Sequence, residues 1–301
     1  MGLGCAGWVF SGDYIFTSVF AILVTIGQLE YFRGVLQTGV YPARRISVVG
    51  SAAMFITALV APRLHQICLP LFATYAMIFL LTFKKKPSSI NEIATTLFGM
   101  FYIGYLPSFW VRVRPMGSLE VTKLHSFKKV LASYFSVRMY QLPKFIPNLL
   151  HLPITHGAVF IFWAWICIAF SDVGAYFVGK NFGNTKLEKV STAAGATSPN
   201  KTLEGVFGGC AVSGVLGMLG AWVMNWGKRW YLWGFGHGVV LAMLGLIGDL
   251  TASMLKRDAG IKDFGDFIPE HGGVLDRVDS FIFSGWYSWL FISYVVPWLK
   301  K

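Results

Sequence analysis

The sequence predicts an all-α polytopic membrane protein with about eight transmembrane helices, or nine if one further segment crosses the bilayer. Of its 301 residues, 55% are hydrophobic, 16% are aromatic and only 13% are charged, whereas an ordinary soluble domain carries about 25% charged residues. The apolar residues also stand in nearly uncharged blocks, which approach the ~20 residues that a helix needs to cross ~30 Å of hydrocarbon. Composition and block length together disfavour a soluble domain.

Eight apolar segments follow one another along the chain. They cover residues 14–28, 46–61, 67–83, 93–111, 154–170, 203–226, 231–250 and 281–298. The first two are short for a membrane span. Between the fourth and the fifth, residues 112–153 combine basic with aromatic side chains, which predicts an amphipathic helix at the membrane interface or a ninth span.

The net charge of +12 raises the question of a nucleic-acid partner. The basic residues, however, stand in short runs between the apolar blocks, as in Arg44-Arg45, Lys84-Lys85-Lys86 and Lys128-Lys129. Loops that face anionic lipid have this pattern. We therefore expect a lipid bilayer around the helices and no nucleic-acid partner.

With eight spans, four connecting segments fall on one side of the membrane, namely residues 33–45, 84–92, 171–202 and 251–277. The first two are strongly basic, so the positive-inside rule makes this side cytoplasmic or its organellar equivalent. The basic segment 112–153 then falls on the opposite side, against the rule.

The apolar segment 203–226 carries small residues at every fourth position, which are Gly205, Gly209, Ser213, Gly217 and Ala221. Such a ladder lets helix backbones approach closely in lipid. It is equally consistent with packing inside one bundle and with a homodimer contact.

The acidic residues concentrate in one window near the carboxyl end. Seven of the fourteen Asp and Glu residues fall between positions 249 and 279, where four Lys and Arg residues also stand, for a local net charge of −3. Asp249 ends an apolar block, and an acid at membrane depth costs roughly 2.5–3.5 kcal/mol. A solvated loop does not explain such an acid, so Asp249 is a candidate functional residue.

Two walls of a site can be built from this window. If the helix continues past residue 250, Asp249, Ser253, Lys256 and Arg257 share one of its faces. Mg²⁺ prefers carboxylate oxygens together with substrate phosphate oxygens, and the two cations suit the remaining phosphate charge.

The second wall contains His271, Gly272, Gly273, Asp276 and Arg277. The glycine pair permits a tight turn and close approach of the backbone to an anion. A helix that starts after the pair would aim free N–H groups at a phosphate.

Another polar cluster lies upstream and contains Asp172, Lys180, Lys201 and Thr202. Ser198 or Thr202 is equally consistent with an ordinary cap of the helix that follows.

Two stretches resemble one known family. The run from Ser253 to Asp279, with Lys256-Arg257, Gly272-Gly273 and Asp276-Arg277, is similar to the signature of phosphatidate cytidylyltransferases, also called CDP-diacylglycerol synthases. The stretch from Asp172 to Gly205 resembles the upstream block of the same family, so that the similarity covers roughly residues 160–285.

The sequence also indicates which branch of this family the chain resembles. Gly248-Asp249 and the run from Lys256 to Gly260 are closer to the bacterial and plastid branch than to the endoplasmic-reticulum branch. Glu270 stands where the family usually has glycine, and Lys180 stands where arginine is common. We expect a plastid envelope, thylakoid-type or bacterial inner membrane rather than the endoplasmic reticulum.

The resemblance implies transfer of a cytidylyl group from CTP to phosphatidate, which yields CDP-diacylglycerol and pyrophosphate, with Mg²⁺ or another divalent cation as cofactor. The implied metal ligands are Asp249 and Asp276, with Asp279, Asp263 and Asp172 in further coordination or supporting roles. The implied phosphate-binding cations are Lys256, Arg257, Arg277 and Lys201, with Lys180 also at the substrate. The implied hydrogen-bond donors are Ser253, Thr202 and the backbone of Gly272-Gly273. His271 either orients a phosphate or only stabilises the turn.

We therefore expect residues 1–153 to form N-terminal membrane helices with an amphipathic connector, and residues 154–301 to form a catalytic transmembrane domain. Two alternatives remain open. A related CTP-dependent polyprenol or phytol kinase would share the metal carboxylates but would phosphorylate an alcohol. A secondary transporter would place matching polar residues in both halves, whereas here they cluster in the carboxyl half.

Overall fold

The computed structural model describes residues 2–117, 155–265 and 272–300, and helices dominate all three stretches. The amino-terminal stretch contains α1 (Gly2–Val9), α2 (Asp13–Gln37), α3 (Arg44–Val60), α4 (His65–Ile78) with the π-helix η1 (Phe79–Phe83), and one continuous rod made of α5 (Ile90–Phe98), the π-helix η2 (Gly99–Tyr105) and α6 (Leu106–Val113). The all-α prediction is confirmed for the described residues.

The carboxyl-terminal stretches continue the helical architecture. They contain α9 (His156–Phe182), the 3₁₀-helix η4 (Leu187–Lys189), α10 (Thr192–Thr197), α11 (Leu203–Val223), α12 (Trp230–Asp258), α13 (Leu275–Ile282), α14 (Ser284–Leu290), the π-helix η5 (Phe291–Val295) and α15 (Val296–Leu299). Lys186 and Thr202 form an isolated antiparallel β-bridge in the connection between α9 and α11.

Five helices among the described residues are long and apolar enough to cross a membrane: Asp13–Gln37, His65–Phe83, His156–Phe182, Leu203–Val223 and Trp230–Asp258. The chain is thus a membrane protein by its helices, while the count of eight or nine spans remains a prediction. The proposed amphipathic helix or ninth span lies mostly within residues 118–154, outside the described residues.

Three helices extend well beyond the apolar blocks that predicted them. The predicted apolar spans end near residues 28, 170 and 250, whereas the helices α2, α9 and α12 end at Gln37, Phe182 and Asp258. Hydropathy marks only the part of a helix that suits lipid, but backbone hydrogen bonds continue into the polar turns. Asp172 therefore lies inside a helix, and α12 continues past residue 250, as the shared face of Asp249, Ser253, Lys256 and Arg257 requires.

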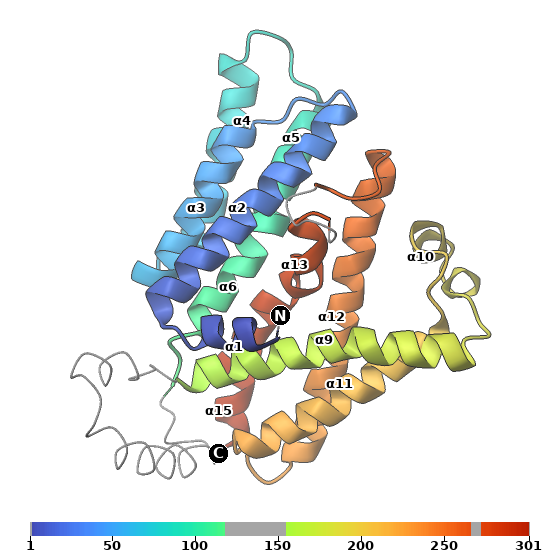
Figure 1. Cartoon of the computed structure of the whole chain (residues 1–301). Helices are drawn as coiled ribbons and strands as arrows, with labels where there is room; N and C mark the ends of the chain where they lie inside the picture. The colour runs from blue at the N-terminus through green and yellow to red at the C-terminus, as the bar shows by residue number, and fades with distance from the viewer. Residues whose placement is uncertain (1, 118–154, 266–271, 301) are drawn as a thin grey trace, which may run out of the picture.

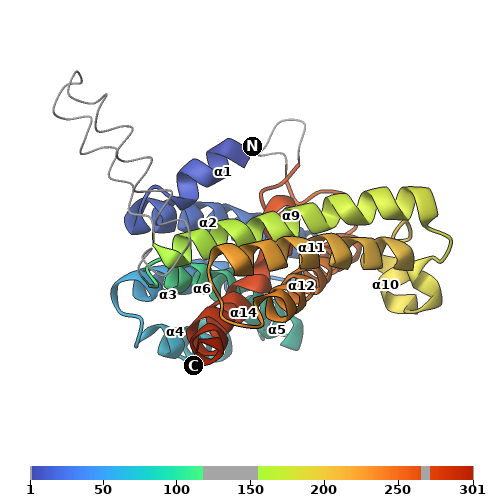
Figure 2. The ribbon, with the colours of Figure 1, turned by 90° about the horizontal axis from the view of Figure 1, so that it is seen from below.

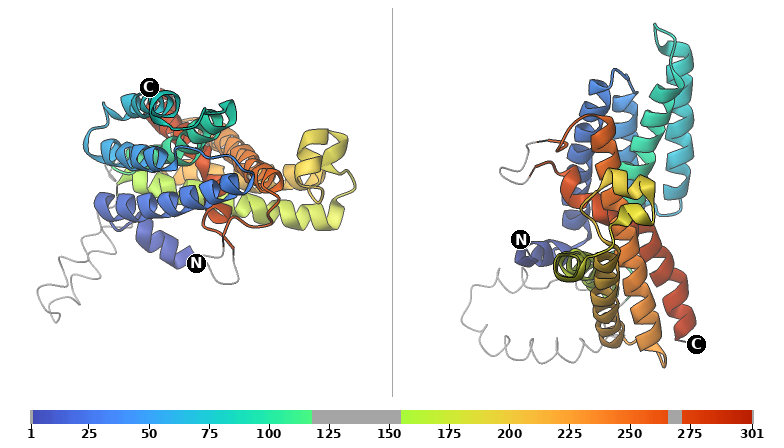
Figure 3. Two further views of the ribbon diagram at one scale, coloured as in Figure 1. Left: turned by 90° about the horizontal axis from the view of Figure 1, so that it is seen from above. Right: turned by 90° about the vertical axis from the view of Figure 1, so that its right-hand side faces the viewer.

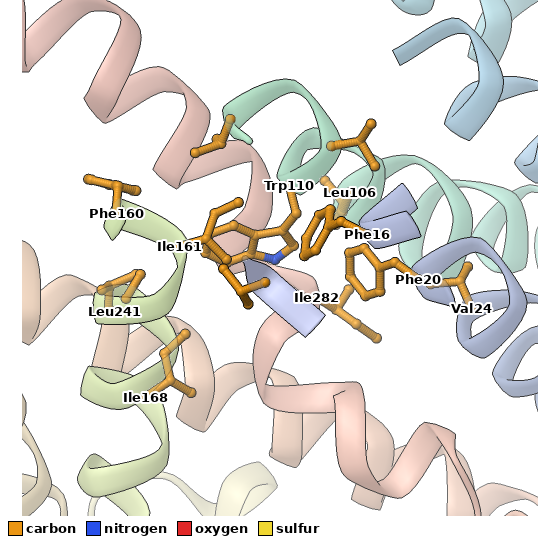
Figure 4. Close-up of a cluster of buried hydrophobic side chains, with 14 of the residues drawn as sticks. Phe16, Phe20, Val24, Leu106, Trp110, Phe160, Ile161, Ile168, Leu241 and Ile282 are labelled. Atoms are coloured by element: carbon orange, nitrogen blue, oxygen red, sulfur yellow. The ribbon is translucent and has the colours of Figure 1, made fainter. Parts of the chain in front are cut away.

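The larger of the hydrophobic clusters among the described residues joins the two halves of the chain. Figure 4 shows Phe16 and Phe20 of α2, Trp110 of α6, Ile161 of α9 and Ile282 of α13 gathered in one cluster. The indole N–H of Trp110 also donates to the carbonyl oxygen of Phe281 at 3.0 Å. The core thus crosses the boundary expected between residues 1–153 and 154–301.

The small-residue ladder of α11 is used inside the chain. Seen from below, α9 and α11 run side by side (Figure 2). A Cβ atom on Gly209 would lie 2.7 Å from the carbonyl oxygen of Ser171 on α9, and the Ser213 hydroxyl donates to the carbonyl oxygen of Gly238 on α12 at 2.7 Å. The ladder therefore packs α11 between α9 and α12 and is itself buried.

One end of the bundle collects the segments that the topology places on one side. The carboxyl ends of α2 and α12 and the start of α5 lie together at the top of Figure 1, and Figure 3 shows the same grouping from two further sides. Thr38, Asn91 and Asp258 from these ends line a common cavity of about 430 Å³. Described residues of segments 33–45, 84–92 and 251–277 thus meet at this cavity, whereas none of segment 171–202 lines it.

Candidate active site

A cavity of about 500 Å³ opens between α9, α11 and α12. Its polar lining includes Asp172, Tyr176, Lys180, Asn200, Lys201, Thr202 and Asp249. Apolar surface from Val206, Ala242 and Leu246 covers the rest of the wall. The cavity therefore combines charged groups with apolar helix faces.

The two polar clusters of the sequence meet in this cavity. The Lys201 ammonium forms an ion pair with the Asp249 carboxylate, and the two side chains are 26% and 35% exposed. Asp172 lies within electrostatic range of both Lys201 and Asp249. Side chains from three separate helices or their ends thus share one charged patch.

The position of Lys201 follows from how α11 begins. Thr202 is the N-cap, and its hydroxyl accepts a hydrogen bond from the Gly205 N–H at 3.2 Å. The Glu204 carboxylate accepts from the Thr185 N–H at 3.0 Å, which ties the α9–α11 connection to the same turn. Thr202 is therefore a helix cap, and it also lines the cavity.

Asp276 lies in the first turn of α13 and holds the glycine turn before it. One carboxylate oxygen accepts from the Lys256 ammonium at 2.6 Å. The other accepts from the backbone N–H groups of Phe264 at 3.1 Å and Gly273 at 3.3 Å. Gly272 has a φ of +79°, a left-handed conformation that favours glycine.

Asp279 lies on α13, one turn after Asp276, and is buried where α13 packs against α12, the helix that carries Asp249. Its carboxylate accepts from the Ser280 N–H at 2.7 Å, and the side chain is only 6% exposed. The charges of Asp249 and Asp276 both act on it. Close packing at Gly248, where a Cβ atom would collide with the Asp279 carbonyl oxygen, brings α12 and α13 together at this level.

The remaining predicted residues lie around this centre. Ser253 is half-buried on α12, whereas Arg257 and Arg277 are exposed on α12 and α13. Asp263 is exposed in the loop between these helices. Lys180 is exposed at the cavity, with its ammonium 3.5 Å from the Tyr176 hydroxyl. His271 lies outside the described residues.

Glu30 was missed by reasoning from the sequence. It lies on α2, is 6% exposed, and accepts hydrogen bonds from the N–H groups of Val274 at 3.0 Å and Leu275 at 2.9 Å. Its available signal was an acid beside an apolar block, which is the same signal that singled out Asp249. That signal does not reveal the partner, because Glu30 and the start of α13 are far apart in the sequence.

The donor set limits how a metal ion could be held. Among the described residues, no three His, Cys, Asp or Glu side chains form a group that could hold an ion. Mg²⁺ usually keeps several waters and binds through one or two carboxylates plus substrate phosphates. Asp249 lines the cavity and Asp276 stands in the first turn of α13, so each can offer one carboxylate to an ion held in that mode. Together with Lys201, Lys256 and the glycine turn, they suit recognition of phosphate groups.

The sequence is similar to known proteins along nearly its whole length. Residues 1–295 match the cytidylyltransferase family. A phosphatidate cytidylyltransferase of Synechocystis sp. is 37% identical over 292 residues, which cover 96% of this chain and 92% of the relative. The chloroplastic phosphatidate cytidylyltransferase 5 of Arabidopsis thaliana is 32% identical over 298 residues, or 97% of this chain and 69% of the relative. A phosphatidate cytidylyltransferase of Bacillus subtilis is 41% identical over 128 residues, or 42% of this chain and 45% of the relative.

Proposed function

The chain belongs to the cytidylyltransferase family, and from this membership we propose that it transfers a cytidylyl group from CTP to phosphatidate. The products are CDP-diacylglycerol and pyrophosphate. Similarity to proteins named phosphatidate cytidylyltransferase over most of the chain carries the proposal. The charged cavity at the ends of apolar helices supports it, because a lipid and a water-soluble nucleotide must meet there.

The reaction joins two polyanions. A phosphate oxygen of phosphatidate attacks the α-phosphorus of CTP, the new P–O bond forms, and the bond to the bridging oxygen breaks, so that pyrophosphate leaves with the electron pair. The lipid phosphate is already ionised near pH 7, so no strong general base is needed. The main barrier is charge repulsion and alignment, which positioned cations reduce.

Lys201 and Lys256 supply such cations from two sides. Each ammonium is held by a carboxylate, Asp249 or Asp276, and so has a defined position before substrates bind. Lys180 lines the cavity, and Arg257 and Arg277 are exposed on α12 and α13. In the proposed roles, these side chains bind phosphate oxygens, while the backbone of Gly272-Gly273 approaches an anion closely.

We place a divalent cation, Mg²⁺ by preference, at Asp249 and Asp276, with Asp279 between them as a supporting group. A bound Mg²⁺ would neutralise phosphate charge and polarise the attacked phosphorus. Asp172 lines the cavity from α9, together with Lys201 and Asp249. The exposed loop position of Asp263 makes it the weakest of the proposed ligands.

The lipid substrate explains why the cavity lies beside membrane helices. Phe170, Val173 and Phe177 of α9 are exposed apolar side chains close in sequence to Asp172. Acyl chains can stay in the bilayer along this face while the head group reaches the charged cavity. The cyanobacterial and chloroplastic relatives favour a bacterial inner membrane or a plastid membrane over the endoplasmic reticulum.

A labelling experiment separates this activity from that of the related kinases. Purified chain in detergent is supplied with phosphatidate or with phytol, in parallel reactions with [α-³²P]CTP and [γ-³²P]CTP. We expect lipid-soluble label only with phosphatidate and [α-³²P]CTP, because nucleotidyl transfer retains the α-phosphate. Label from [γ-³²P]CTP in phytol would instead indicate a kinase, and no labelled lipid in any reaction would contradict both enzymes.

A further inference from the structure

Glu30 reaches the candidate active site from the other half of the chain. It projects from α2 to the start of α13, where its two carboxylate oxygens each accept one backbone N–H, from Val274 and Leu275. Val274 is the N-cap of α13 and Leu275 is its first residue. These N–H groups have no partner within the helix, so Glu30 supplies the acceptors that the helix itself lacks.

Two glycines make room for this carboxylate. A Cβ atom on Gly265 would lie 2.7 Å from Glu30 Oε1, and one on Gly273 would lie 2.8 Å from Glu30 Oε2. Both distances are shorter than the non-bonded distances that Cβ atoms adopt in proteins, so an alanine at either position would clash with the carboxylate. The absence of side chains at these two positions therefore lets the Glu30 carboxylate reach the backbone of α13.

The turn that Glu30 holds is the turn that Asp276 holds from its other side. Asp276 Oδ2 accepts from Phe264 N–H and Gly273 N–H, while Asp276 Oδ1 is paired with Lys256. Glu30 holds the next two N–H groups along the chain. A shift at the start of α13 would therefore move Asp276 relative to Lys256.

We infer that Glu30 is a positioning residue, whose two hydrogen bonds to the start of α13 set the placement of Asp276 in the active site. This inference rests on the proposed function, in which Asp276 is part of the cation and phosphate site. Glu30 itself is assigned no contact with substrate. Its role links α2, from the amino-terminal half, to the chemistry of the carboxyl-terminal half.

Glu30→Gln is the direct test, because glutamine keeps the shape but replaces one accepting oxygen with an amide nitrogen that cannot accept an N–H. We expect turnover at saturating CTP and phosphatidate to fall about tenfold, the usual effect of losing a supporting partner of a metal ligand, and half-activation to need more Mg²⁺. The KM for phosphatidate should change little. Glu30→Asp, which retains both acceptors on a shorter side chain, should recover part of the turnover.

Glu92→Gln is the matched control. Glu92 is also a buried carboxylate of the amino-terminal half, and it holds the start of its own helix through the Ser89 N–H at 3.0 Å and an ion pair with Lys84. It should leave turnover and Mg²⁺ dependence at wild-type values. If Glu92→Gln lowers turnover as much as Glu30→Gln does, or if Glu30→Gln has wild-type kinetics, the inference is wrong.

Hydrogen exchange measured by mass spectrometry provides a readout that does not depend on activity. Peptides containing Val274 and Leu275 should exchange faster in Glu30→Gln than in the wild-type chain, while peptides of α11 should be unchanged. Unchanged exchange at α13 would overturn the inference. If the wild-type chain makes no CDP-diacylglycerol, the proposed function fails, but the exchange result still decides whether Glu30 holds α13.

Gly265→Ala serves if Glu30→Gln does not fold, because it displaces the carboxylate from outside. We expect it to lower turnover and to accelerate exchange at α13 in the same way. Gly236→Ala on α12 is its control, since a Cβ atom there meets nothing within 4 Å. Wild-type kinetics in Gly265→Ala would contradict the positioning role.

Discussion

At the scale of single residues, the candidate site is organised as two lysine–carboxylate pairs. Lys201 holds Asp249 across the cavity, and Lys256 holds Asp276 beside the glycine turn. In each pair the lysine and the carboxylate compensate each other's charge, because an unpaired charge in a partly buried position would be unfavourable. The same four groups are the ones to which the proposed function assigns phosphate and cation binding.

Asp249→Asn and Asp276→Asn should each lower turnover about 100-fold or more, because asparagine keeps the shape but loses the charge that a divalent cation requires. Steady-state assays with CTP and phosphatidate measure the effect, and melting temperatures show whether the fold is retained. Glu188→Gln removes an exposed acid outside the cavity and should be kinetically silent. Near wild-type turnover in either aspartate variant would overturn its place in the site.

Lys201→Ala should lower kcat/KM without much change in melting temperature. The ion pair with Asp249 is partly exposed, and such pairs contribute roughly 0–1 kcal/mol to stability, whereas a lost phosphate contact acts on the transition state. Lys84→Ala breaks a comparable pair with Glu92 away from the cavity. Equal kinetic effects of the two variants would remove Lys201 from the site.

Thr202→Ala should lower the free energy of unfolding by about 1 kcal/mol, since it removes the N-cap hydrogen bond of α11. Chemical denaturation in mixed micelles measures the change. Thr202→Ser keeps the hydroxyl and should restore most of the stability. A fully stable Thr202→Ala would mean that this cap contributes little to the start of α11.

At the scale of helices, the cavity exists because α9, α11 and α12 pack closely through small residues. Gly205 and Gly209 bring α11 against the backbone of α9, and Ser213 bonds to the backbone of α12. At these points the helix backbones approach closely, because no larger side chain separates them. The register of this packing places Lys201 opposite Asp249.

Gly209→Ala should therefore destabilise the protein, because its Cβ atom would lie 2.7 Å from the Ser171 carbonyl oxygen, a backbone atom that cannot rotate away. Gly236→Ala, at a helical position with open space, should leave the melting temperature unchanged or raise it, since alanine is the better helix former. Thermal melts of both variants test the contrast. A Gly209→Ala variant as stable as Gly236→Ala would contradict close packing at this contact.

At the scale of the whole molecule, the two halves form one unit. The core in Figure 4 contains helices from both halves, and Glu30 of α2 bonds to α13. The ends of α2, α5 and α12 also meet around a shared cavity. The amino-terminal helices thus support the site although they contribute none of the predicted ligands.

Cysteines introduced at Asn184, Lys85 and Asp263 should all be labelled from the same side of the membrane, because both polar clusters must face the compartment that supplies CTP. A cysteine at Lys228, in the loop between α11 and α12, should be labelled from the other side. The measurement uses a membrane-impermeant maleimide on oriented vesicles, with the four native cysteines replaced. Labelling of Asn184 and Asp263 from opposite sides would break the shared site.

The helical membrane architecture, the family and the two charged clusters could all be predicted from the amino-acid sequence. These properties depend on composition and on motifs that are local in the chain, such as the apolar blocks and the run from Ser253 to Asp279. Hydropathy could not locate the ends of α2, α9 and α12, because a helix continues wherever its backbone bonds are satisfied, in lipid or in water. The continuation of α12 past Asp249 was therefore a condition of the predicted site, and the structure fulfils it.

Which charged residues contact one another could be learned from the packing of the helices alone. The pairing of Lys201 with Asp249 depends on how α11 packs between α9 and α12, and the bonds from Glu30 to the start of α13 depend on a contact between distant segments. An acidic residue in an apolar helix predicts that a hydrogen-bond donor or a cation lies beside it, because a buried charge without such a partner is unfavourable. The identity of that partner depends on how the helices pack against one another. Contacts between helices have no fixed spacing along the chain, so the sequence pattern does not reveal them.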